Sequence, residues 1–386
     1  MYVLKFGGSS VANAERIKGV AEIVVSAKKK HKQVAVVISA LGGVTDELIA
    51  LTNGALQGEE NIKETFKKVE TRHYEAVKAL VPVQRQTQVL GNVVHTLNQL
   101  YDILKGISLI REVSPKTHDL VISFGERLSA YIVSEGLKEY VKDAAFADAR
   151  QFIKTNGDFG NAKVNFSKTN KLIREYFANT KGTHVVTGFI ASTDNGDTTT
   201  LGRSGSDYTA SIVGAALKAE AIEIWTDVDG ILTADPRKVA QAFPLKQVTY
   251  EEAMELSHFG AKVIFPATMQ PAMALKIPIW VKNTFKPEYE GTIISHKASA
   301  DDHPVKGISS LSSISLLNVQ GSGMVGVAGV AGRLFAALSA AKVNIILISQ
   351  ASSEHSICIA VSSSDANRNI QQVGVKIEGE KVSDKA

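Results

Sequence analysis

Short apolar runs alternate with helical patterns along the first three quarters of the chain. Residues 2–6 and 34–39 form apolar runs of strand length, and residues 11–30 between them place apolar side chains such as Ile17 and Val20 at helical spacing. Later strand-like runs cover residues 120–123, 184–189, 221–226 and 279–281. Strand, helix and strand in repeated order predict a three-layer αβα sandwich around a mainly parallel central sheet.

Residues 59–111 do not follow that alternation. They are mostly polar and compatible with helix, with interruptions at Gly91 and Gly106. This pattern predicts two long helices inserted into the sheet domain. The sequence leaves open whether these helices form a lid or an oligomer surface.

The character of the chain changes near its residue 295. The next ten residues are polar and include a proline, which is typical of a linker. Beyond them the pattern predicts β-type runs at 305–311 and 314–319, a helix at 331–342, strands at 343–349 and 356–362, and a second helix from Asp365. The order β-α-β-β-α describes a small ferredoxin-like module.

Composition and charge narrow the class of protein. The 386 residues are 44% hydrophobic and 21% charged, which excludes a disordered chain. The 43 basic and 39 acidic residues nearly balance, so nucleic acid is not an expected partner. A basic run at residues 28–32 ends a predicted helix, where the helix dipole favours cations.

Cysteine content and hydropathy predict the compartment. Cys358 is the single cysteine and stands in an apolar run, so we expect a buried side chain and no disulfide. No apolar stretch reaches the roughly 18 residues of a membrane span, and no leader-like segment precedes the first predicted strand. We therefore predict a cytoplasmic protein without a membrane partner.

The first candidate site is the turn after the first predicted strand, where Lys5 and Phe6 precede Gly7 and Gly8. Two glycines let the backbone approach a ligand closely, and the following helix offers free amides and a positive dipole end. Lys5 would add a mobile positive charge, so the turn suits a phosphate. A plain capped turn is the alternative, and the P-loop signature is missing.

Two further turns carry polar groups beside strand-like runs. Ser39 and Thr45 offer hydroxyls at the carboxyl end of a strand, the edge where open α/β sheets bind ligands. Thr45 is explained equally well as a helix N-cap. Glu126 follows a glycine, and its carboxylate suits either an amine ligand or a surface ion pair.

The segment 198–207 leads into an apolar helix and carries charged groups. Arg203 offers a planar fork for a carboxylate or phosphate, and Ser206 supplies an amide at the helix start. Asp207 could hold a substrate amine. An ordinary capped loop is the alternative.

A last group of residues could flank a nucleotide. Thr226 and Asp227 end a strand-like run, and Arg237 and Lys262 follow within about 35 residues. The alternating aspartates here resemble the start of a calcium loop, but the twelfth position is Lys238 instead of glutamate.

A glycine pattern at residues 321–326 matches the dinucleotide fingerprint G-x-G-x-x-G. It follows a predicted strand and precedes a helix. The next strand, however, ends near Ser349 without an acidic residue for a ribose hydroxyl. We therefore do not expect this segment to bind NAD.

Taken in order, these motifs resemble the aspartokinase family of amino-acid kinases over nearly the whole chain. The chain is most similar to the kinase half of bifunctional aspartokinase–homoserine dehydrogenases, in residues 4–16, 305–309 and 348–354. The resemblance implies that a second ACT unit and the dehydrogenase half are missing from this chain. It also implies three parts: a catalytic domain at 1–295, a linker at 296–304 and an ACT-type regulatory module at 305–386.

The resemblance implies transfer of the ATP γ-phosphoryl group to the β-carboxylate of L-aspartate, giving 4-phospho-L-aspartate. This is the first step of threonine, lysine and methionine biosynthesis. The acceptor is already ionised at neutral pH, so positive charge and positioning matter more than a general base. Mg²⁺ would enter with ATP, without a metal site on the protein.

The family pattern also implies a role for each candidate residue. Lys5, Arg203 and Asp207 would be catalytic. The nucleotide would contact Lys5, Phe6, Gly7, Gly8, Thr226, Asp227, Leu232, Arg237, Lys262 and Val263. In the aspartate site, Arg203 would bind the α-carboxylate, Glu126 and Asp207 the ammonium group, and Ser39, Thr45 and Ser206 the β-carboxylate.

Two positions depart from the family pattern. Leu232 stands where relatives often have tyrosine, which removes a hydrogen-bonding ring near the nucleotide. Phe265 stands where relatives usually have histidine, and nothing in the sequence explains this change.

The resemblance further implies feedback control by L-threonine, bound between two ACT modules near Asn344 and Gln350. It implies a homodimer or higher homo-oligomer formed through these modules. Two other functions stay open: an acetylglutamate or glutamate kinase of the same fold, and a non-catalytic amino-acid sensor. Arg203 with Glu126 and Asp207 favours a free amino acid as substrate, and an intact Lys5 speaks against an inert domain.

Overall fold

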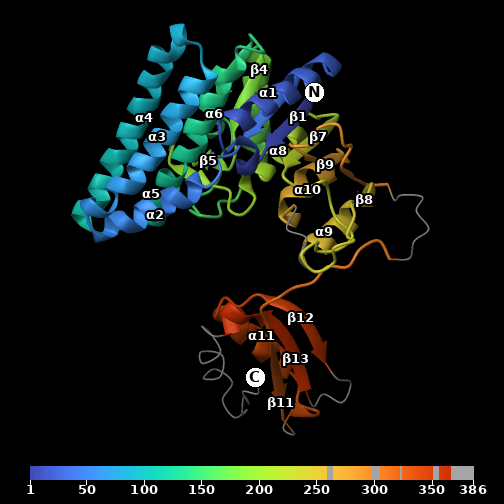
Figure 1. Ribbon diagram of the computed structural model, residues 1–386. Coiled ribbons are helices and arrows are strands. Elements are labelled where there is room, and N and C mark those ends of the chain that lie inside the picture. The colour runs from blue at the N-terminus through green and yellow to red at the C-terminus, as the bar shows by residue number, and fades with distance from the viewer. Residues whose placement is uncertain (259–263, 298–304, 322–323, 351–355, 367–386) are drawn as a thin grey trace. The chain divides into compact units, whose positions relative to one another are not determined.

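The computed structural model describes residues 1–258, 264–297, 305–321, 324–350 and 356–366 (Figure 1). The chain forms two compact units, Met1–Ser309 and Ser310–Ala386. Most of the predicted linker lies outside the described residues. Directly after it, Ile308 donates its N–H to the carbonyl of Thr233 at 2.7 Å, and Lys306 pairs with Glu252 at 2.7 Å. Residues 305–309 therefore belong to the first unit.

In the described part of the first unit, eight strands form one sheet in the order β3-β4-β2-β1-β7-β9-β10-β8. Neighbouring strands are parallel except β9 and β10, which confirms the predicted mainly parallel sheet. Every residue of β2 and β4 is buried, because helices cover both faces. The strands are β1 (Tyr2–Phe6), β2 (Val34–Ile38), β3 (Ala144–Ala147), β4 (Thr183–Thr187), β7 (Ala221–Thr226), β8 (Gln247–Thr249), β9 (Ile279–Asn283) and β10 (Thr292–Ser295).

Side chains of β1 alternate between two hydrophobic cores, one on each face of the sheet. Leu4 and Phe6 belong to one core, and Val3 belongs to the other, so Lys5 lies on the face of Val3. This arrangement confirms the three-layer αβα sandwich. The first core contains residues of α1 (Ala14–Lys30), α2 (Val44–Gln57), α3 (Lys63–Leu80), α4 (Val83–Ile110), α5 (Pro115–Ile122) and α6 (Phe124–Leu137). The second contains residues of α7 (Phe166–Asn179), α8 (Gly205–Ala216), α9 (Tyr250–His258) and α10 (Pro266–Ala274).

Smaller elements complete the first unit. The two long helices predicted within residues 59–111 are confirmed as α3 and α4, which lie side by side (Figure 1). A hairpin joins two short strands near α5. The remaining elements are β5 (Ile190–Ser192), β6 (Thr198–Thr200), η1 (Gly8–Val11), η2 (Glu59–Asn61) and η3 (Ala149–Gln151).

The predicted strand at residues 120–123 is wrong, because this run belongs to helix α5 and to the turn after it. Ser114 caps the helix by accepting the N–H of Thr117 at 3.1 Å, and Pro115 occupies its first turn. A run of three apolar residues and a serine is too short to distinguish a buried helix from a strand. The β-type run predicted at 305–311 is not a strand either.

The second unit has a three-stranded antiparallel sheet in its described part, in the order β11-β13-β12, with helix α11 packed on it. The elements are β11 (Ile314–Gln320), α11 (Val330–Ala340), β12 (Ile345–Gln350) and β13 (Ser356–Ser362). The predicted order β-α-β-β is confirmed, and most of the second helix lies outside the described residues. Cys358 is only partly buried on β13.

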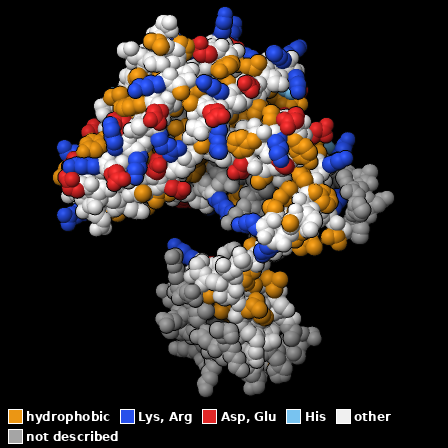
Figure 2. Space-filling view, in the orientation of Figure 1, with side chains coloured by type: hydrophobic (Ala, Val, Ile, Leu, Met, Phe, Trp, Pro, Cys, Tyr) orange, Lys and Arg blue, Asp and Glu red, His pale blue; other side chains and the backbone are white. Residues whose placement is uncertain are grey.

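The surface shows no strong separation of charge where it is described and in view. Basic and acidic side chains are intermixed over the visible face of the first unit (Figure 2). Among the described residues, no helix is long and apolar enough to cross a membrane.

Candidate active site

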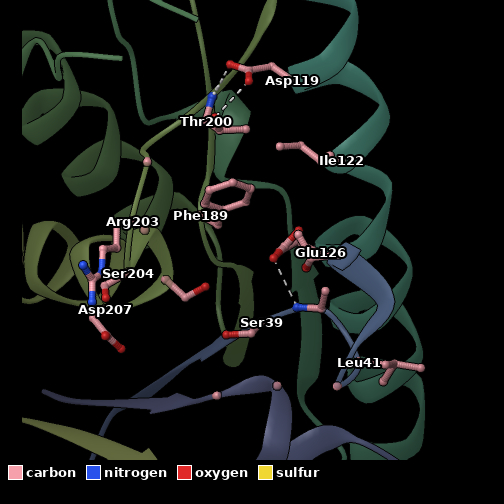
Figure 3. Close-up of a pocket in the computed structure, with 18 of the residues that line it drawn as sticks. Ser39, Leu41, Asp119, Ile122, Glu126, Phe189, Thr200, Arg203, Ser204 and Asp207 are labelled. Atoms are coloured by element: carbon pink, nitrogen blue, oxygen red, sulfur yellow. Dashed lines mark hydrogen bonds between the residues drawn. The ribbon is translucent and has the colours of Figure 1, made fainter. Parts of the chain in front are cut away.

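A cavity of about 590 Å³ opens at the carboxyl ends of β1 and β2. Its walls come from the turns after these strands, from α5 and α6, and from the segment before α8 (Figure 3). This is the edge where open α/β sheets bind ligands. The predicted residues that line it are Lys5, Gly7, Gly8, Ser39, Thr45, Glu126, Arg203, Ser206 and Asp207.

The two glycine turns beside the cavity pack backbone against backbone. A Cβ on Gly8 would lie 3.2 Å from the carbonyl oxygen of Ala40, and one on Gly42 would lie 2.9 Å from that of Gly8. A side chain at Gly42 would therefore force the two turns apart. Arg72 of α3 also holds the second turn, since it donates to the carbonyls of Gly42 at 2.7 Å and Ala12 at 3.3 Å.

Lys5 and Asp207 form a buried ion pair beside the first glycine turn. Lys5 stands near the end of β1 and Asp207 in the first turn of α8, and the distance from Nζ to Oδ1 is 2.5 Å. Their side chains are only 10% and 8% exposed. Oδ1 accepts no hydrogen bond of good geometry from the described residues, so the contact is chiefly one of charge. Each residue is thus the counter-charge of the other in this structure.

Glu126 is buried at the beginning of α6 and keeps one carboxylate oxygen free. Its Oε1 accepts the N–H of Ala40 at 3.2 Å (Figure 3), whereas Oε2 has no hydrogen-bond partner among the described residues. Burial removes the hydration of the charged form and raises the pKa of Glu126 to about 8. A buried acceptor of this kind suits a ligand cation, which would restore the ionised form.

Arg203 lies on a tight turn between β6 and α8. Gly202 before it and Ser204 after it have positive φ angles of 72° and 54°. Its Cζ lies 5.6 Å from the centre of the Phe265 ring, which is the distance of a cation–π contact. Phe265, which the sequence left unexplained, therefore contacts the guanidinium group of a predicted substrate residue.

Several residues that line the cavity were missed by the sequence analysis. Phe189 follows β4 with a φ of 66°, and its N–H donates to the hydroxyl of Thr209 at 3.0 Å. Phe189 ends the strand-like run 184–189, and its apolar side chain gave no sign of a ligand contact. Asp119 was hidden by the wrong strand assignment at 120–123, and its partner Thr200 was not singled out.

Comparison with known proteins agrees with this geometry. Residues 1–283 match the family described as the amino acid kinase family, and residues 317–374 match an ACT domain. Aspartokinase III of E. coli in complex with aspartate and ADP has a similar fold, with a TM-score of 0.81 and 30% identity over 95% of this chain and 79% of that one. The chain belongs to the aspartokinases of the amino acid kinase family.

Bifunctional enzymes are among the curated relatives of this aspartokinase chain. It is 36% identical over 373 residues to the chloroplastic bifunctional aspartokinase/homoserine dehydrogenase 2 of Arabidopsis thaliana, over 95% of this chain and 40% of the relative. It is 34% identical over 369 residues to the bifunctional enzyme of Buchnera aphidicola, over 95% and 45%. The chain thus spans less than half the length of these relatives. Since plant relatives are chloroplastic, the cytoplasmic location stays a prediction.

Three residues of the predicted nucleotide group stand at the carboxyl ends of β1 and β7 and do not line the cavity. They are Phe6, Thr226 and Asp227. Phe6 is fully buried and its ring stacks on Trp225 at 6.0 Å, so only its backbone could contact a ligand. Thr226 ends β7 beside the first glycine turn, because Gly7 donates its N–H to the carbonyl of Trp225 at 3.2 Å. The Thr226 hydroxyl donates to Asp227 at 3.2 Å.

The other nucleotide-side residues lie further along the chain. Leu232 is half-buried in the segment between β7 and β8. Arg237 in the same segment is 79% exposed and pairs with Asp235 at 2.8 Å. Lys262 and Val263 lie outside the described residues. The structure therefore brings the predicted phosphate and aspartate groups into one cavity. The other described residues of the predicted nucleotide group do not line it.

The two predicted regulatory residues stand at opposite ends of β12. Asn344 directly precedes this strand and Gln350 is its last residue, and both are exposed. Six residues of strand span about 20 Å. One small amino acid therefore cannot touch both side chains of the same module.

Proposed function

We propose that this chain transfers the γ-phosphoryl group of ATP to the β-carboxylate of L-aspartate. The observation that carries the proposal is the meeting, in one cavity, of the Lys5–Asp207 ion pair, the free oxygen of Glu126 and Arg203. These groups provide a cation for a phosphate, acceptors for an ammonium group and a planar fork for a carboxylate. A free amino acid with an acidic side chain needs each of them.

The proposed mechanism relies on charge and positioning. Arg203 pairs with the α-carboxylate, Glu126 and Asp207 accept the ammonium protons, and Ser39, Thr45 and Ser206 orient the β-carboxylate toward the phosphorus. Lys5 and the amides of Gly7 and Gly8 stabilise the negative charge of the transferred group. No group has to remove a proton, because the attacking carboxylate is already ionised.

Mg²⁺ would arrive on the phosphates of ATP in this proposal. Among the described residues, no group of three or more His, Cys, Asp or Glu side chains could hold a metal ion. In kinases Mg²⁺ is usually held by substrate phosphates, water and one or two carboxylates.

A hydroxamate assay with ATP tests the activity and separates the alternatives. We expect acyl phosphate from L-aspartate, at least ten times faster than from L-glutamate or N-acetylglutamate. The extra methylene of glutamate displaces the side-chain carboxylate from its line with the phosphorus, and N-acetylglutamate also lacks the ammonium group that Glu126 would accept. Preference for either alternative substrate would identify a different amino-acid kinase. Binding of an amino acid without phosphoryl transfer would identify a sensor.

We further propose that L-threonine regulates the enzyme by binding between two ACT modules of a homo-oligomer. The positions of Asn344 and Gln350 support two modules, because antiparallel β12 strands of two copies would bring Asn344 of one beside Gln350 of the other. Leu347 on β12 is 51% exposed and would be covered in part by such contact. Threonine inhibits only if it binds the inactive state more tightly than the active one.

Calorimetry with L-threonine and L-lysine tests the regulatory site. We expect threonine to bind the wild type and to lose most of its heat in Gln350→Ala. Gln320→Ala, at the end of β11, is a matched control and should bind as the wild type does. Equal heats in the wild type and Gln350→Ala would contradict the site, and lysine binding alone would indicate a lysine-sensitive enzyme.

A further inference from the structure

Asp119 carries a buried negative charge that the proposed phosphoryl transfer does not use. It lies on α5, is fully buried, and belongs to the wall of the cavity (Figure 3). Its Oδ2 accepts the N–H groups of Gly160 at 2.8 Å and Thr200 at 2.9 Å, and its Oδ1 accepts the Thr200 hydroxyl at 3.0 Å. Both oxygens are therefore bound to protein donors, and such bonds to an ionised acceptor are strong.

These bonds hold the strand that leads to Arg203. Thr200 is the last residue of β6, and its carbonyl accepts the N–H of Ala162 at 3.0 Å. The next residue, Leu201, donates its N–H to the carbonyl of Phe189 at 2.9 Å. Three segments of the chain therefore hold the backbone at Thr200 and Leu201 by hydrogen bonds, through Asp119, Ala162 and Phe189. Thr200 lies three residues before Arg203.

The loop around Gly160 supports the Arg203 turn from its other side. A Cβ on Gly202 would lie 2.5 Å from Oδ1 of Asn161, the residue after Gly160, so the loop and the turn are in close contact. Asp119 binds both Gly160 and Thr200. One carboxylate therefore holds both the loop and the strand. Together these two segments determine the backbone position of Arg203.

We propose that Asp119 is a positioning residue, which sets the turn from which Arg203 reaches the α-carboxylate of aspartate. The inference rests on the proposed aspartate kinase function and adds a residue that does not itself contact substrate. Displacing a binding group by about 1 Å can reduce kcat/KM by up to about 100-fold. The loss should affect the binding of aspartate and not that of ATP. The residues proposed to bind phosphate are Lys5, Gly7 and Gly8, and they lie at the end of a different strand, β1.

Asp119→Asn tests the proposal with little change of volume. Asparagine carries no charge and has one acceptor oxygen, so its bonds to the N–H groups of Gly160 and Thr200 are weaker, and it cannot accept the Thr200 hydroxyl at the same time. We expect kcat/KM for aspartate to fall by roughly 10- to 100-fold, mainly through KM, while KM for ATP stays within about twofold. An unchanged KM for aspartate, or an equal rise in both KM values, would overturn the proposal.

A pair of Thr200 variants and one control variant serve if Asp119→Asn does not fold. Thr200→Val loses the hydroxyl bonded to Oδ1 and should raise KM for aspartate about threefold to tenfold, whereas Thr200→Ser keeps that bond and should match the wild type. Lys116→Gln is the matched control, because the Lys116–Asp197 ion pair, at 2.6 Å, joins α5 to the same hairpin near the surface. It should leave KM for aspartate unchanged. Equal effects of Thr200→Val and Lys116→Gln would contradict the proposal.

A double-mutant cycle shows whether Asp119 acts through Arg203. In an Arg203→Ala background, Asp119→Asn should weaken aspartate binding no further, since the group it positions is gone. The same fold-change in both backgrounds would overturn the proposal. Calorimetric titration with aspartate gives this comparison without turnover. A wild type that binds aspartate but does not phosphorylate it would therefore contradict the proposed function alone.

Discussion

Two parts of the candidate site each contain an ion pair of a basic and an acidic residue, in different surroundings. One is the group of predicted residues that line the cavity, called the aspartate half here although it includes Lys5, which is assigned to the transferred phosphate. The other is the predicted nucleotide side around Arg237. Lys5 and Asp207 form an ion pair whose side chains are about one tenth exposed. Arg237 and Asp235 also form an ion pair, but the arginine is 79% exposed. The first pair joins strand β1 to helix α8, whereas the second joins neighbours two residues apart in a surface segment.

Burial, more than residue type, therefore distinguishes a charged side chain that can bind a ligand from a charged side chain that is merely solvated. Charges interact several times more strongly near a protein interior than in water, and exposed pairs contribute little. A buried group without a partner, such as Oε2 of Glu126, is costly unless a ligand binds it. Substitutions should therefore have large effects in the aspartate half and small effects along the segment of Arg237.

The largest effect is expected from Lys5→Ala. Loss of one contact to the transferred group should lower kcat by about 10²- to 10³-fold with little change in KM for aspartate. It also leaves Asp207 buried without its counter-charge, which should lower the free energy of unfolding by roughly 3–5 kcal/mol. Steady-state kinetics and chemical denaturation measure the two effects.

The variant Lys5→Ala with Asp207→Asn separates these effects. Removing both charges should recover much of the lost stability, because no unpaired charge stays buried. Turnover should stay low. Near-normal turnover in either variant would remove Lys5 from the mechanism.

Arg203→Lys should have the next largest effect, on KM for aspartate. A lysine ammonium is a point charge and cannot form the two parallel hydrogen bonds of a guanidinium with a carboxylate. We expect KM for aspartate to rise by about 10-fold or more, with KM for ATP nearly constant. A rise in KM for ATP alone would mean that Arg203 serves the nucleotide.

A third prediction concerns the pH dependence caused by Glu126. The pKa of this carboxyl is raised from 4.5 to about 8, so in the free enzyme the ionised fraction grows about tenfold between pH 6 and pH 7. Only the ionised form pairs with an ammonium group. We therefore expect kcat/KM for aspartate to rise by up to about tenfold per pH unit and to level off near pH 8.

Glu126→Gln is the control for the pH profile. Glutamine keeps the shape and an acceptor for the Ala40 N–H but does not titrate, so its profile should be flat over the same range. A profile that still rises in this variant would assign the titration to another group.

Arg237→Ala should have the smallest effect. Its partner Asp235 is a near neighbour, and the arginine side chain is largely in water, so neither folding nor aspartate binding depends on it. We expect an increase in KM for ATP of at most about fivefold, and no measurable change in unfolding. A loss as large as that of Lys5→Ala would show that the nucleotide side is as critical as the aspartate half.

Local patterns were sufficient to predict much of the fold. Continuous apolar runs predicted the buried parallel strands, because such strands are covered on both faces, and the helical spacing predicted α3 and α4. The turn after Lys5 could also be predicted as a phosphate site from local sequence. Its strand end, its two glycines and the start of the next helix follow one another directly along the chain. The strand prediction at 120–123 was wrong because three apolar residues and a serine carry no decisive period.

The pairs that make the candidate site depend on tertiary structure alone. Glu126 and Ala40 are 86 residues apart, and Asp119 and Thr200 are 81 apart, yet each pair is hydrogen-bonded. Lys5 meets Asp207 because β1 turns its side chain toward the layer that holds α8. Periodicity reports which face of its own element a residue occupies, but the order of strands and the packing of helices decide which distant residue lies opposite. Those long-range contacts set the burial and the partner of each charge, and so decide which of many polar residues can bind a ligand.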